Sequence, residues 1–386
     1  MNILFYYTKT ITPKHGGIAR VTLSLANQFR IEGHNVYCLS SKKTNNDEDK
    51  EQHYLPQKTK VICEENKKYF IKFIKDHSIN IIINQNGTTP IENEAIMWGH
   101  EINIPIITVL HSSLFGIYGI HQNKLIKYLP LIKFFKADKI LNRITHYYFK
   151  CKYGKYYKEQ VRKCAQIVLL SKYFFPEIKY FSGIESDNIT HISNPLTVNH
   201  DYNDKTTKEK ELLYVGRISY EKRVDLLLKI WKKIQHKYPD WKLTIIGDGP
   251  LKHKIELMAN KLQLQRISFK GYKDPNKYYK RASIFCMTSA FEGFGLVLIE
   301  AMKYGTVPLA FNSYANVSEI IDNNENGFLI PPFSIDKYVT QLSFLIENNN
   351  KRKIMGEKAI IKSDNFKIEA VSNEWNTLFK SILNNH

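Results

Sequence analysis

The sequence predicts an α/β protein made of two doubly wound domains in tandem, and two observations lead to this fold class. Short apolar runs alternate with longer amphipathic stretches in both halves of the chain, which is typical of repeated βα units around a parallel sheet. The chain has 386 residues and is 43% hydrophobic, so it is too long for one ordinary core and apolar enough for two domains of common size.

We interpret the apolar runs as the strands of two parallel sheets. In the first half they read NILFYY, NVYCLS, NIIINQNG, PIITVLHSS and QIVLLS. In the second half they read ELLYVGR, KLTIIGDG, RISFKGY, ASIFCMTS, TVPLAF and GFLIPP, each followed by a helical segment or a turn. Ligands of such sheets bind at the carboxyl ends of the strands, so we expect the site at those ends, in a cleft between the domains.

The stretch between the two halves, HISNPLTVNHDYNDKTTKEK, is polar and is the clearest linker signal in the chain. We therefore expect a first domain over residues 1–200 and a second over residues 201–367. The remaining residues, 368–386, have the spacing of an amphipathic helix from about Ile368 to Leu383. This helix could pack back onto the first domain, and the sequence alone does not identify its partner surface.

Targeting signals and metal-binding motifs are not evident. No stretch reaches the roughly 18 consecutive apolar residues of a spanning helix, and MNILFYYTKT lacks the features of a signal peptide, so we expect a cytoplasmic protein. The five cysteines form no CxxC pair, which favours reduced, structural thiols. Asp47 and Asp49 alone resemble a metal-binding carboxylate pair, and a solvated charge run explains them better. We expect no metal and no cofactor.

A formal net charge of +19 suits nucleic acid, an anionic membrane or an anionic substrate. No RNA-recognition or helix-turn-helix motif accompanies the charge, which weakens the first option. The charge is concentrated between His121 and Lys163, where many lysines and arginines are opposed only by Asp138 and Glu159. Interleaved Leu, Ile, Phe and Tyr suggest one or two helices lying on a membrane surface, peripheral on its cytoplasmic face. An ordinary helix with solvated lysines is the competing interpretation.

The most informative motif is SAFEGFGLVLIEAMKYG, which places Glu292 and Glu300 eight positions apart. Gly293 and Gly295 stand between a strand-like run and a helix-like run, so Glu292 is expected in a loop and Glu300 on the helix. A glycine turn that opens a helix presents free N–H groups and the positive end of the helix dipole, which suit a phosphate. Two flanking acids suggest a sugar-like ligand beside that phosphate.

Basic residues follow the first strand of the second half, in LLYVGRISYEKRVDLLLKIW. Arg217 comes directly after the strand, and Lys222 and Arg223 come before or at the next helix. A guanidinium and an ammonium can grip a diphosphate together, and in a parallel sheet they would lie beside the turn near Glu292. For Arg223, a solvated turn paired with Glu221 is the plausible alternative.

Three features of the first half stand at the same predicted edge. Gly16 and Gly17 precede a helix, although they lack the full spacing of a dinucleotide fingerprint, and an ordinary loop turn is an equal alternative. His111 ends a strand and starts the loop HSSLFG, so its imidazole would point into the cleft; a structural histidine is the equal alternative. Asn84 and Asn86 follow another strand, where turn formation is the favoured interpretation.

Taken together, these motifs resemble the GT-B-fold, retaining glycosyltransferases of family 4, also called glycosyl transferases group 1. In that family two Rossmann-like domains face each other across a nucleotide-sugar cleft. The resemblance spans nearly the whole chain and is most specific in GRISYEKR and EGFGLVLIE, followed by AMKYGTVPLAF and by Glu319 in VSEII. In the first half HGGIAR and VLHSS are similar to the family's glycine loop and cleft histidine.

The resemblance implies roles for individual residues. Arg217 and Lys222 would neutralise the leaving diphosphate, and Glu300 would bind the ribose hydroxyls. Glu292 would contact the donor hexose and help to stabilise positive charge near the anomeric centre, and His111 would hydrogen-bond the sugar. The remaining substrate-binding positions implied are backbone or ring contacts at Gly16, Gly17, Gly271, Tyr272, Gly293, Phe294 and Gly295.

The implied activity is transfer of a hexose or N-acetylhexosamine from a nucleotide-diphosphate sugar to a glycan or lipid-linked saccharide, with retention, in cell-surface polysaccharide biosynthesis. UDP is the favoured nucleotide, with GDP and ADP open. Breaking the glycosyl phosphate bond develops negative charge on the diphosphate, so fixed cations and N–H donors lower the barrier without a metal. The alternatives are a nucleotide-sugar epimerase of the same fold and a basic nucleic-acid-binding protein.

Overall fold

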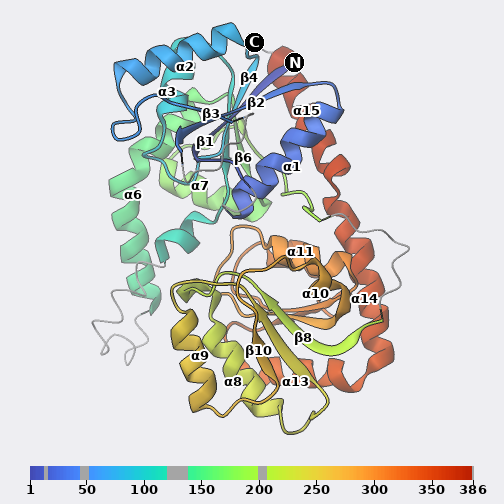
Figure 1. Cartoon of the computed structure of the whole chain (residues 1–386). Coiled ribbons are helices and arrows are strands. Elements are labelled where there is room, and N and C mark those ends of the chain that lie inside the picture. Colours follow the sequence, from blue (N-terminus) through green and yellow to red (C-terminus); the bar gives the residue numbers. More distant parts are fainter. Residues whose placement is uncertain (13–15, 44–51, 120–137, 199–206, 385–386) are drawn as a thin grey trace. The chain divides into compact units, whose positions relative to one another are not determined.

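The structure is a computed structural model that describes residues 1–12, 16–43, 52–119, 138–198 and 207–384 (Figure 1). It divides into two compact units. The first unit contains Met1–Pro195 together with Ile368–His386, and the second contains Leu196–Lys367. Each unit is a parallel sheet with helices connecting its strands, so the predicted α/β class is confirmed.

The sheet of the first unit has seven parallel strands in the order β3-β2-β1-β4-β5-β6-β7. The predicted runs supply five of them. The strands β3 and β7 were not predicted, because each has three residues and neither is a continuous apolar run. The strand bounds are β1 Asn2–Lys9, β2 Asn35–Lys42, β3 Gln52–Tyr54, β4 Ile81–Asn84, β5 Ile106–Leu110, β6 Gln166–Leu169 and β7 Ile189–His191.

Helices connect these strands and bury apolar faces against the sheet. Their bounds are α1 Gly17–Ile31, α2 Glu64–Asp76, α3 Glu94–Glu101, α6 Asp138–Lys163, the 3-10 turn η2 Lys172–Phe174, α7 Phe175–Ser182 and α15 Ile368–Asn384.

The helix α15 packs on α1 of the first unit. Phe29 of α1 meets Phe379 and Trp375 of α15, with ring centroids 5.3 and 6.5 Å apart. Beside this aromatic contact the carboxylate of Glu32 accepts hydrogen bonds from the Ser372 hydroxyl at 2.6 Å and from the Asn376 amide at 2.7 Å. Apolar and polar contacts therefore hold α15 against α1.

The sheet of the second unit has six parallel strands in the order β10-β9-β8-β11-β12-β13, and each predicted run of the second half overlaps one of them. The strands are β8 Glu209–Val215, β9 Lys242–Ile246, β10 Ile267–Phe269, β11 Ala282–Met287, β12 Val307–Phe311 and β13 Phe328–Ile330. The helices are α8 Val224–Ile234, α9 Lys252–Lys261, α10 Asn276–Arg281, α11 Leu296–Lys303, α12 Val317–Ile320, α13 Ile335–Glu347 and α14 Asn349–Ser363, with 3-10 turns η3 Tyr220–Lys222 and η4 Asp364–Phe366.

The order of this sheet places β8 beside β11, although the two strands are far apart in sequence. The strand β11 is buried throughout, and β8 is buried from Glu211 to Tyr214. Apolar side chains of both strands join one core cluster with those of α8 and α13. Because the two strands are parallel, the segments that follow them leave the sheet at the same edge. These segments carry the basic and glycine-rich motifs.

Candidate active site

The glycine turn lies between β11 and α11. Gly295 caps α11 with φ of 98°, a left-handed conformation that a residue with a side chain adopts only with strain. The Asn316 amide donates to the carbonyl oxygens of Gly293 and Phe294 at 3.3 and 3.0 Å, and these two hydrogen bonds fix the turn. Within the described residues the N–H groups of Gly293, Phe294 and Gly295 donate no hydrogen bond. The turn thus presents donors to a ligand.

An ion pair joins the two loops at this edge. The Lys222 ammonium lies 2.6 Å from both oxygens of the Glu292 carboxylate, and the Ser289 hydroxyl donates to the same carboxylate at 2.6 Å. The Lys222 side chain is 21% exposed and that of Glu292 is 9% exposed. The backbones meet as well, because the Ala290 N–H donates to the Glu221 carbonyl at 2.7 Å. The structure therefore brings Lys222 and Glu292 together, and the ion pair itself was not foreseen.

The two arginines of this segment differ. Arg217 is exposed, and its guanidinium has no ion-pair partner in the described part of the chain. Arg223 pairs with Asp225 at 3.0 Å and lies over the Phe333 ring. The alternative pairing of Arg223 with Glu221 is therefore wrong. The reason is local, since Arg223 has a left-handed backbone at the start of α8 and Asp225 is in the first turn of that helix.

Glu300 lies on α11 and is fully buried. Its carboxylate accepts one hydrogen bond from the Thr197 hydroxyl at 2.7 Å and one from the Tyr279 hydroxyl at 2.9 Å. Sequence reasoning missed both partners. Thr197 lies in the predicted linker and Tyr279 on the short helix α10, and neither stands in a recognisable motif. Glu292 and Glu300 thus have different surroundings, one paired with a cation and the other held by hydroxyls.

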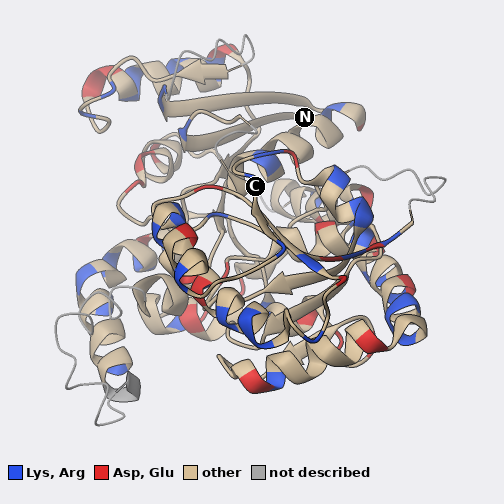
Figure 2. Ribbon diagram, turned by 60° about the horizontal axis from the view of Figure 1, so that its bottom comes forward, with Lys and Arg blue, Asp and Glu red and all other residues tan. Residues whose placement is uncertain are grey.

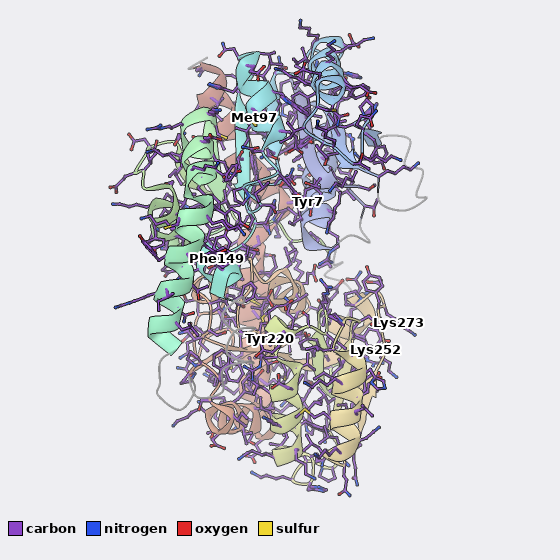
Figure 3. All side chains as sticks on the ribbon, turned by 90° about the vertical axis from the view of Figure 1, so that its left-hand side faces the viewer. Tyr7, Met97, Phe149, Tyr220, Lys252 and Lys273 are labelled. Atoms are coloured by element: carbon purple, nitrogen blue, oxygen red, sulfur yellow. The ribbon has the colours of Figure 1, made fainter. Side chains whose placement is uncertain are left out.

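The two positions expected near the nucleobase come shortly after β10, the strand at one edge of the same sheet. Gly271 has φ of 66°, and Tyr272 is 73% exposed. Lys252 and Lys273 lie at this turn (Figure 3), and the Lys252 ammonium would be 3.8 Å from a Cβ placed on Gly271. The neighbouring Gly247 directly follows β9 and has a structural role. A Cβ there would lie 1.9 Å from the Gly216 carbonyl oxygen.

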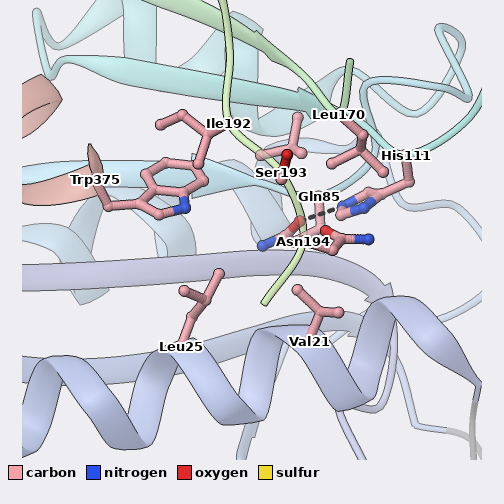
Figure 4. Close-up of a pocket in the computed structure, with 10 residues that line it drawn as sticks. Val21, Leu25, Gln85, His111, Leu170, Ile192, Ser193, Asn194 and Trp375 are labelled. Atoms are coloured by element: carbon pink, nitrogen blue, oxygen red, sulfur yellow. Dashed lines mark hydrogen bonds between the residues drawn. The ribbon is translucent and has the colours of Figure 1, made fainter. Parts of the chain in front are cut away.

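His111 directly follows β5 in the first unit and is 5% exposed. Its Nε2 is hydrogen-bonded to the amide oxygen of Gln85, and its backbone N–H donates to the Thr88 hydroxyl at 2.8 Å. Burial lowers the pKa of His111 to about 3, so the ring is neutral near pH 7. We predict that the imidazole points into the cleft; within the first unit the ring is buried beside Gln85 (Figure 4), a residue that sequence reasoning did not select.

The other candidates of the first unit follow their expected positions in the chain. Gly16 caps α1 with φ of 98°, and a Cβ on it would meet nothing within 4 Å. Gly17 is the first residue of α1. Asn84 and Asn86 are buried, and the Asn86 N–H donates to the Asn84 amide oxygen at 3.2 Å, in agreement with a role in turn formation. They also bond to strands, because Asn84 donates to the Thr108 hydroxyl of β5 and Asn86 accepts from the Thr8 N–H of β1.

Metal ligands are not grouped in the described residues, where no cluster of three or more His, Cys, Asp or Glu could hold an ion. Asp47 and Asp49 lie outside the described residues. All five cysteines are described, and none of them forms a disulfide. Among the described helices none is long and apolar enough to cross a membrane.

Comparison with known proteins finds a family match within the second unit. Residues 197–362 match the family of glycosyl transferases group 1. An uncharacterized glycosyltransferase of Haemophilus influenzae is 33% identical over 58% of this chain and 62% of its own length. The amylovoran biosynthesis glycosyltransferase AmsD of Erwinia amylovora is 32% identical over 44% and 48%, respectively. The poly(ribitol-phosphate) alpha-N-acetylglucosaminyltransferase of Staphylococcus aureus is 29% identical over 59% and 46%. The chain thus spans 46–62% of the length of these relatives.

Solved structures define the fold. A TarM mutant of S. aureus, in complex with Fondaparinux, alpha-GlcNAc-glycerol and UDP, has a TM-score of 0.73 and 16% identity, covering 98% of this chain and 99% of that one. Anabaena HepE in complex with UDP and glucose has a TM-score of 0.74 and 15% identity, covering 99% and 100%. The chain therefore has the GT-B fold, with two Rossmann-like α/β domains.

Proposed function

We propose that this protein is a retaining glycosyltransferase of family 4 that uses a UDP-linked hexose or N-acetylhexosamine. Its acceptor is a glycan or a lipid-linked saccharide, and its product belongs to a cell-surface polysaccharide. Support comes from the group 1 match over residues 197–362. It also comes from one relative named for amylovoran biosynthesis and another named as a poly(ribitol-phosphate) alpha-N-acetylglucosaminyltransferase. The observation that carries the proposal is the grouping of Lys222, Glu292 and the unpaired N–H groups of the glycine turn after β8 and β11.

This grouping suits a departing diphosphate. Arg217 supplies an exposed guanidinium, and Lys222 supplies an ammonium that the turn already holds in place. Free N–H groups at the start of α11 add the positive end of a helix dipole. Together they stabilise negative charge that grows as the glycosyl phosphate bond breaks, and they need no metal ion for this. Gly271 and Tyr272 provide a backbone turn and an exposed ring for the base.

The two acids act on different parts of the donor. Glu292 contacts the hexose and stabilises positive charge at the anomeric carbon, because its carboxylate is fixed by Ser289 and Lys222. Glu300 binds the ribose hydroxyls, which then share its oxygens with Thr197 and Tyr279 or displace them. The epimerase alternative requires a proton donor and acceptor around the sugar. His111, whose pKa burial lowers to about 3, is a poor proton donor at neutral pH.

The surface of α6 favours a peripheral location of the protein on the cytoplasmic face of a membrane. One side of α6 is buried, where Phe149 stacks on Tyr118 at 4.4 Å and the Tyr157 hydroxyl meets that of Tyr118 at 2.8 Å (Phe149 is labelled in Figure 3). The other side is basic and aromatic, and its exposed residues are Arg143, Ile144, Tyr147, Tyr148, Cys151, Lys152, Lys155, Lys158 and Arg162. Figure 2 colours the lysines and arginines blue along the ribbon. Such a face suits anionic headgroups, where a lipid-linked acceptor is presented. Residues 121–137 of the predicted segment lie outside the described residues.

Titration calorimetry with UDP, GDP and ADP tests the proposal, with and without a chelator. We expect selective binding of UDP that the chelator leaves unchanged. Arg217→Ala should weaken it by about 10–100-fold, because a charge-assisted contact to phosphate is lost. Lys229→Ala, which removes an exposed cation from α8, is the matched control and should bind normally. Failure of all three nucleotides to bind would refute the donor site. Retention is checked by the anomeric coupling of the product in NMR spectra.

A further inference from the structure

The segment that follows β12 lies against the glycine turn. Strands β11 and β12 pair in parallel register, so the segments after them leave the sheet at the same edge. The Ser313 hydroxyl donates to the Ser289 carbonyl at 2.6 Å. The Asn316 amide donates to the carbonyls of Gly293 and Phe294 at 3.3 and 3.0 Å. Side chains that follow β12 therefore hold three carbonyl oxygens of the segment between β11 and α11.

These hydrogen bonds determine the orientation of the Asn316 amide. A carbonyl oxygen only accepts, so the NH₂ group of Asn316 faces the turn and its own oxygen, Oδ1, faces away. Asn316 is fully buried, and within the described residues Oδ1 has no hydrogen-bond partner. An unpaired buried acceptor weakens a fold, so the benefit of this amide lies in the two carbonyls that it holds.

Holding the two carbonyls also determines the direction of two N–H groups. The peptide bonds of the turn are trans, and in a trans peptide the C=O and the N–H of one plane point in opposite directions. The carbonyls of Gly293 and Phe294 point toward Asn316, so the N–H groups of Phe294 and Gly295 point away from it. Neither N–H donates a hydrogen bond in the part of the chain that the structure describes. Asn316 thus directs two available donors at the start of α11, which Figure 1 labels.

The rest of the turn does not fix these peptide planes. The Phe294 ring is 3% exposed and meets Phe366 of η4, with ring centroids 5.6 Å apart, which anchors the side chain. Gly295 has φ of 98°, and glycine adopts φ of either sign at little cost, so the plane between Phe294 and Gly295 can flip while the ring stays in place. The hydrogen bond from Asn316 to the Phe294 carbonyl selects one of the two orientations.

We propose that Asn316 is a positioning residue for the diphosphate: it fixes the two peptide planes so that the N–H groups of Phe294 and Gly295 face the phosphate oxygens. This inference rests on the proposed function and deepens it. Asn316 acts through the turn and does not touch the substrate. Donors that are already oriented stabilise the charge of the leaving diphosphate without reorganisation during the reaction. Loss of the Asn316 amide should therefore weaken diphosphate binding and slow transfer further.

The orientation of the peptide planes is tested first, because it needs no ligand. Asn316→Leu keeps the approximate size of the side chain and removes its donors. Relaxation-dispersion ¹⁵N NMR spectra of the full chain detect exchange between two backbone orientations. We expect no exchange at Phe294 and Gly295 in the unaltered chain and clear exchange in Asn316→Leu. Equal spectra from the two chains overturn the inference.

Titration with UDP and with uridine separates the diphosphate from the rest of the nucleotide. In Asn316→Leu the preference for UDP over uridine should fall about tenfold, because oriented donors to a charged group are lost. The kcat of UDP-sugar turnover should fall by about 100-fold. Asn326→Leu is the matched control, since Asn326 is a buried amide of the same unit that accepts from the Asp322 N–H at 3.0 Å. It should leave the preference for UDP unchanged.

Asn316→Asp gives a second test that holds even if Asn316→Leu does not fold. A carboxylate cannot donate to the turn, whereas a protonated carboxyl group donates one hydrogen bond. The Kd of UDP for this variant, divided by that for the unaltered chain at the same pH, should therefore fall as the pH is lowered from 8 to 6. A ratio that does not change with pH overturns the inference.

The outcomes separate the two claims. If UDP does not bind to the unaltered chain, the proposed function and the diphosphate role fail together, and the relaxation spectra alone decide whether Asn316 orients the turn. If UDP binds, but Asn316→Leu weakens UDP and uridine equally, Asn316 is only structural and the inference fails alone.

Discussion

Replacing Glu292 by Gln should strengthen UDP binding while it weakens transfer. In the ligand-free structure both Glu292 oxygens lie 2.6 Å from the Lys222 ammonium, which we propose as a diphosphate contact. To bind phosphate, Lys222 must leave this carboxylate or share it, and the carboxylate also repels the incoming anion. Gln keeps the size of the side chain and an oxygen for the Ser289 hydroxyl, and it removes the charge.

The size of the effect follows from the exposure of the pair. Hydrogen bonds to charged groups contribute about 1.5–3 kcal/mol. The Lys222 side chain is 21% exposed, so solvent recovers part of this when the pair opens. A net gain of about 1–2 kcal/mol corresponds to roughly 5–30-fold tighter UDP binding. Transfer should fall by about 100-fold, because a fixed charge near the reacting centre is lost.

Titration calorimetry measures the first effect, and turnover of the UDP-sugar measures the second. Glu221→Gln is the control, because Glu221 lies on the same turn and accepts from the Ser219 hydroxyl instead of from Lys222. Lys222→Ala should weaken UDP binding. The reasoning is refuted if Glu292→Gln binds UDP no more tightly than the unaltered chain while Lys222→Ala binds it equally well.

The remaining predictions concern stability and surface binding. Burial raises the pKa of Glu177 to about 7, so the folded protein is most stable while this acid is protonated. The free energy of unfolding should therefore fall by about 2 kcal/mol between pH 5.5 and 8. In urea melts, Glu177→Gln should lack this decline. Gly247→Ala should prevent folding or cost more than about 3 kcal/mol, measured by soluble yield and urea midpoint, whereas Gly33→Ala, at φ of 86° in open space, should cost about 1 kcal/mol. Trp375→Ala should cost about 3–5 kcal/mol in the same melts, because a buried aromatic ring is removed from α15. Tyr147→Ser with Tyr148→Ser should reduce co-sedimentation with phosphatidylserine vesicles about tenfold relative to Ile361→Ser, and equal binding by both variants would favour solvated lysines.

The sequence was informative where structure depends on local pattern. Apolar runs bounded by turns predicted the buried strands of both sheets, because burial on both faces leaves a run that is apolar throughout. The short strands β3 and β7 escaped because they have no such run. The glycine at position 295 was recognisable as a turn residue, and its left-handed backbone explains the signal.

Partner choice within the site was not recoverable from local pattern. Lys222 meets Glu292 only because β8 lies beside β11, an order that periodicity does not encode. The hydroxyl partners of Glu300 come from a linker and from a short helix for the same reason. The burial of His111 beside Gln85 depends likewise on the pairing of β4 with β5.

The return of α15 to α1 has a consequence for synthesis of the chain. Ser372 and Glu32 bond across 340 residues, so the first unit lacks one of its helices until the entire second unit has left the ribosome. The second unit is continuous and can fold as soon as it emerges. Until then Phe29 and Leu25 are not covered by Trp375 and Phe379, so the nascent protein exposes an apolar patch. We expect chaperones to engage this patch during translation and to release it once residues 368–384 are made.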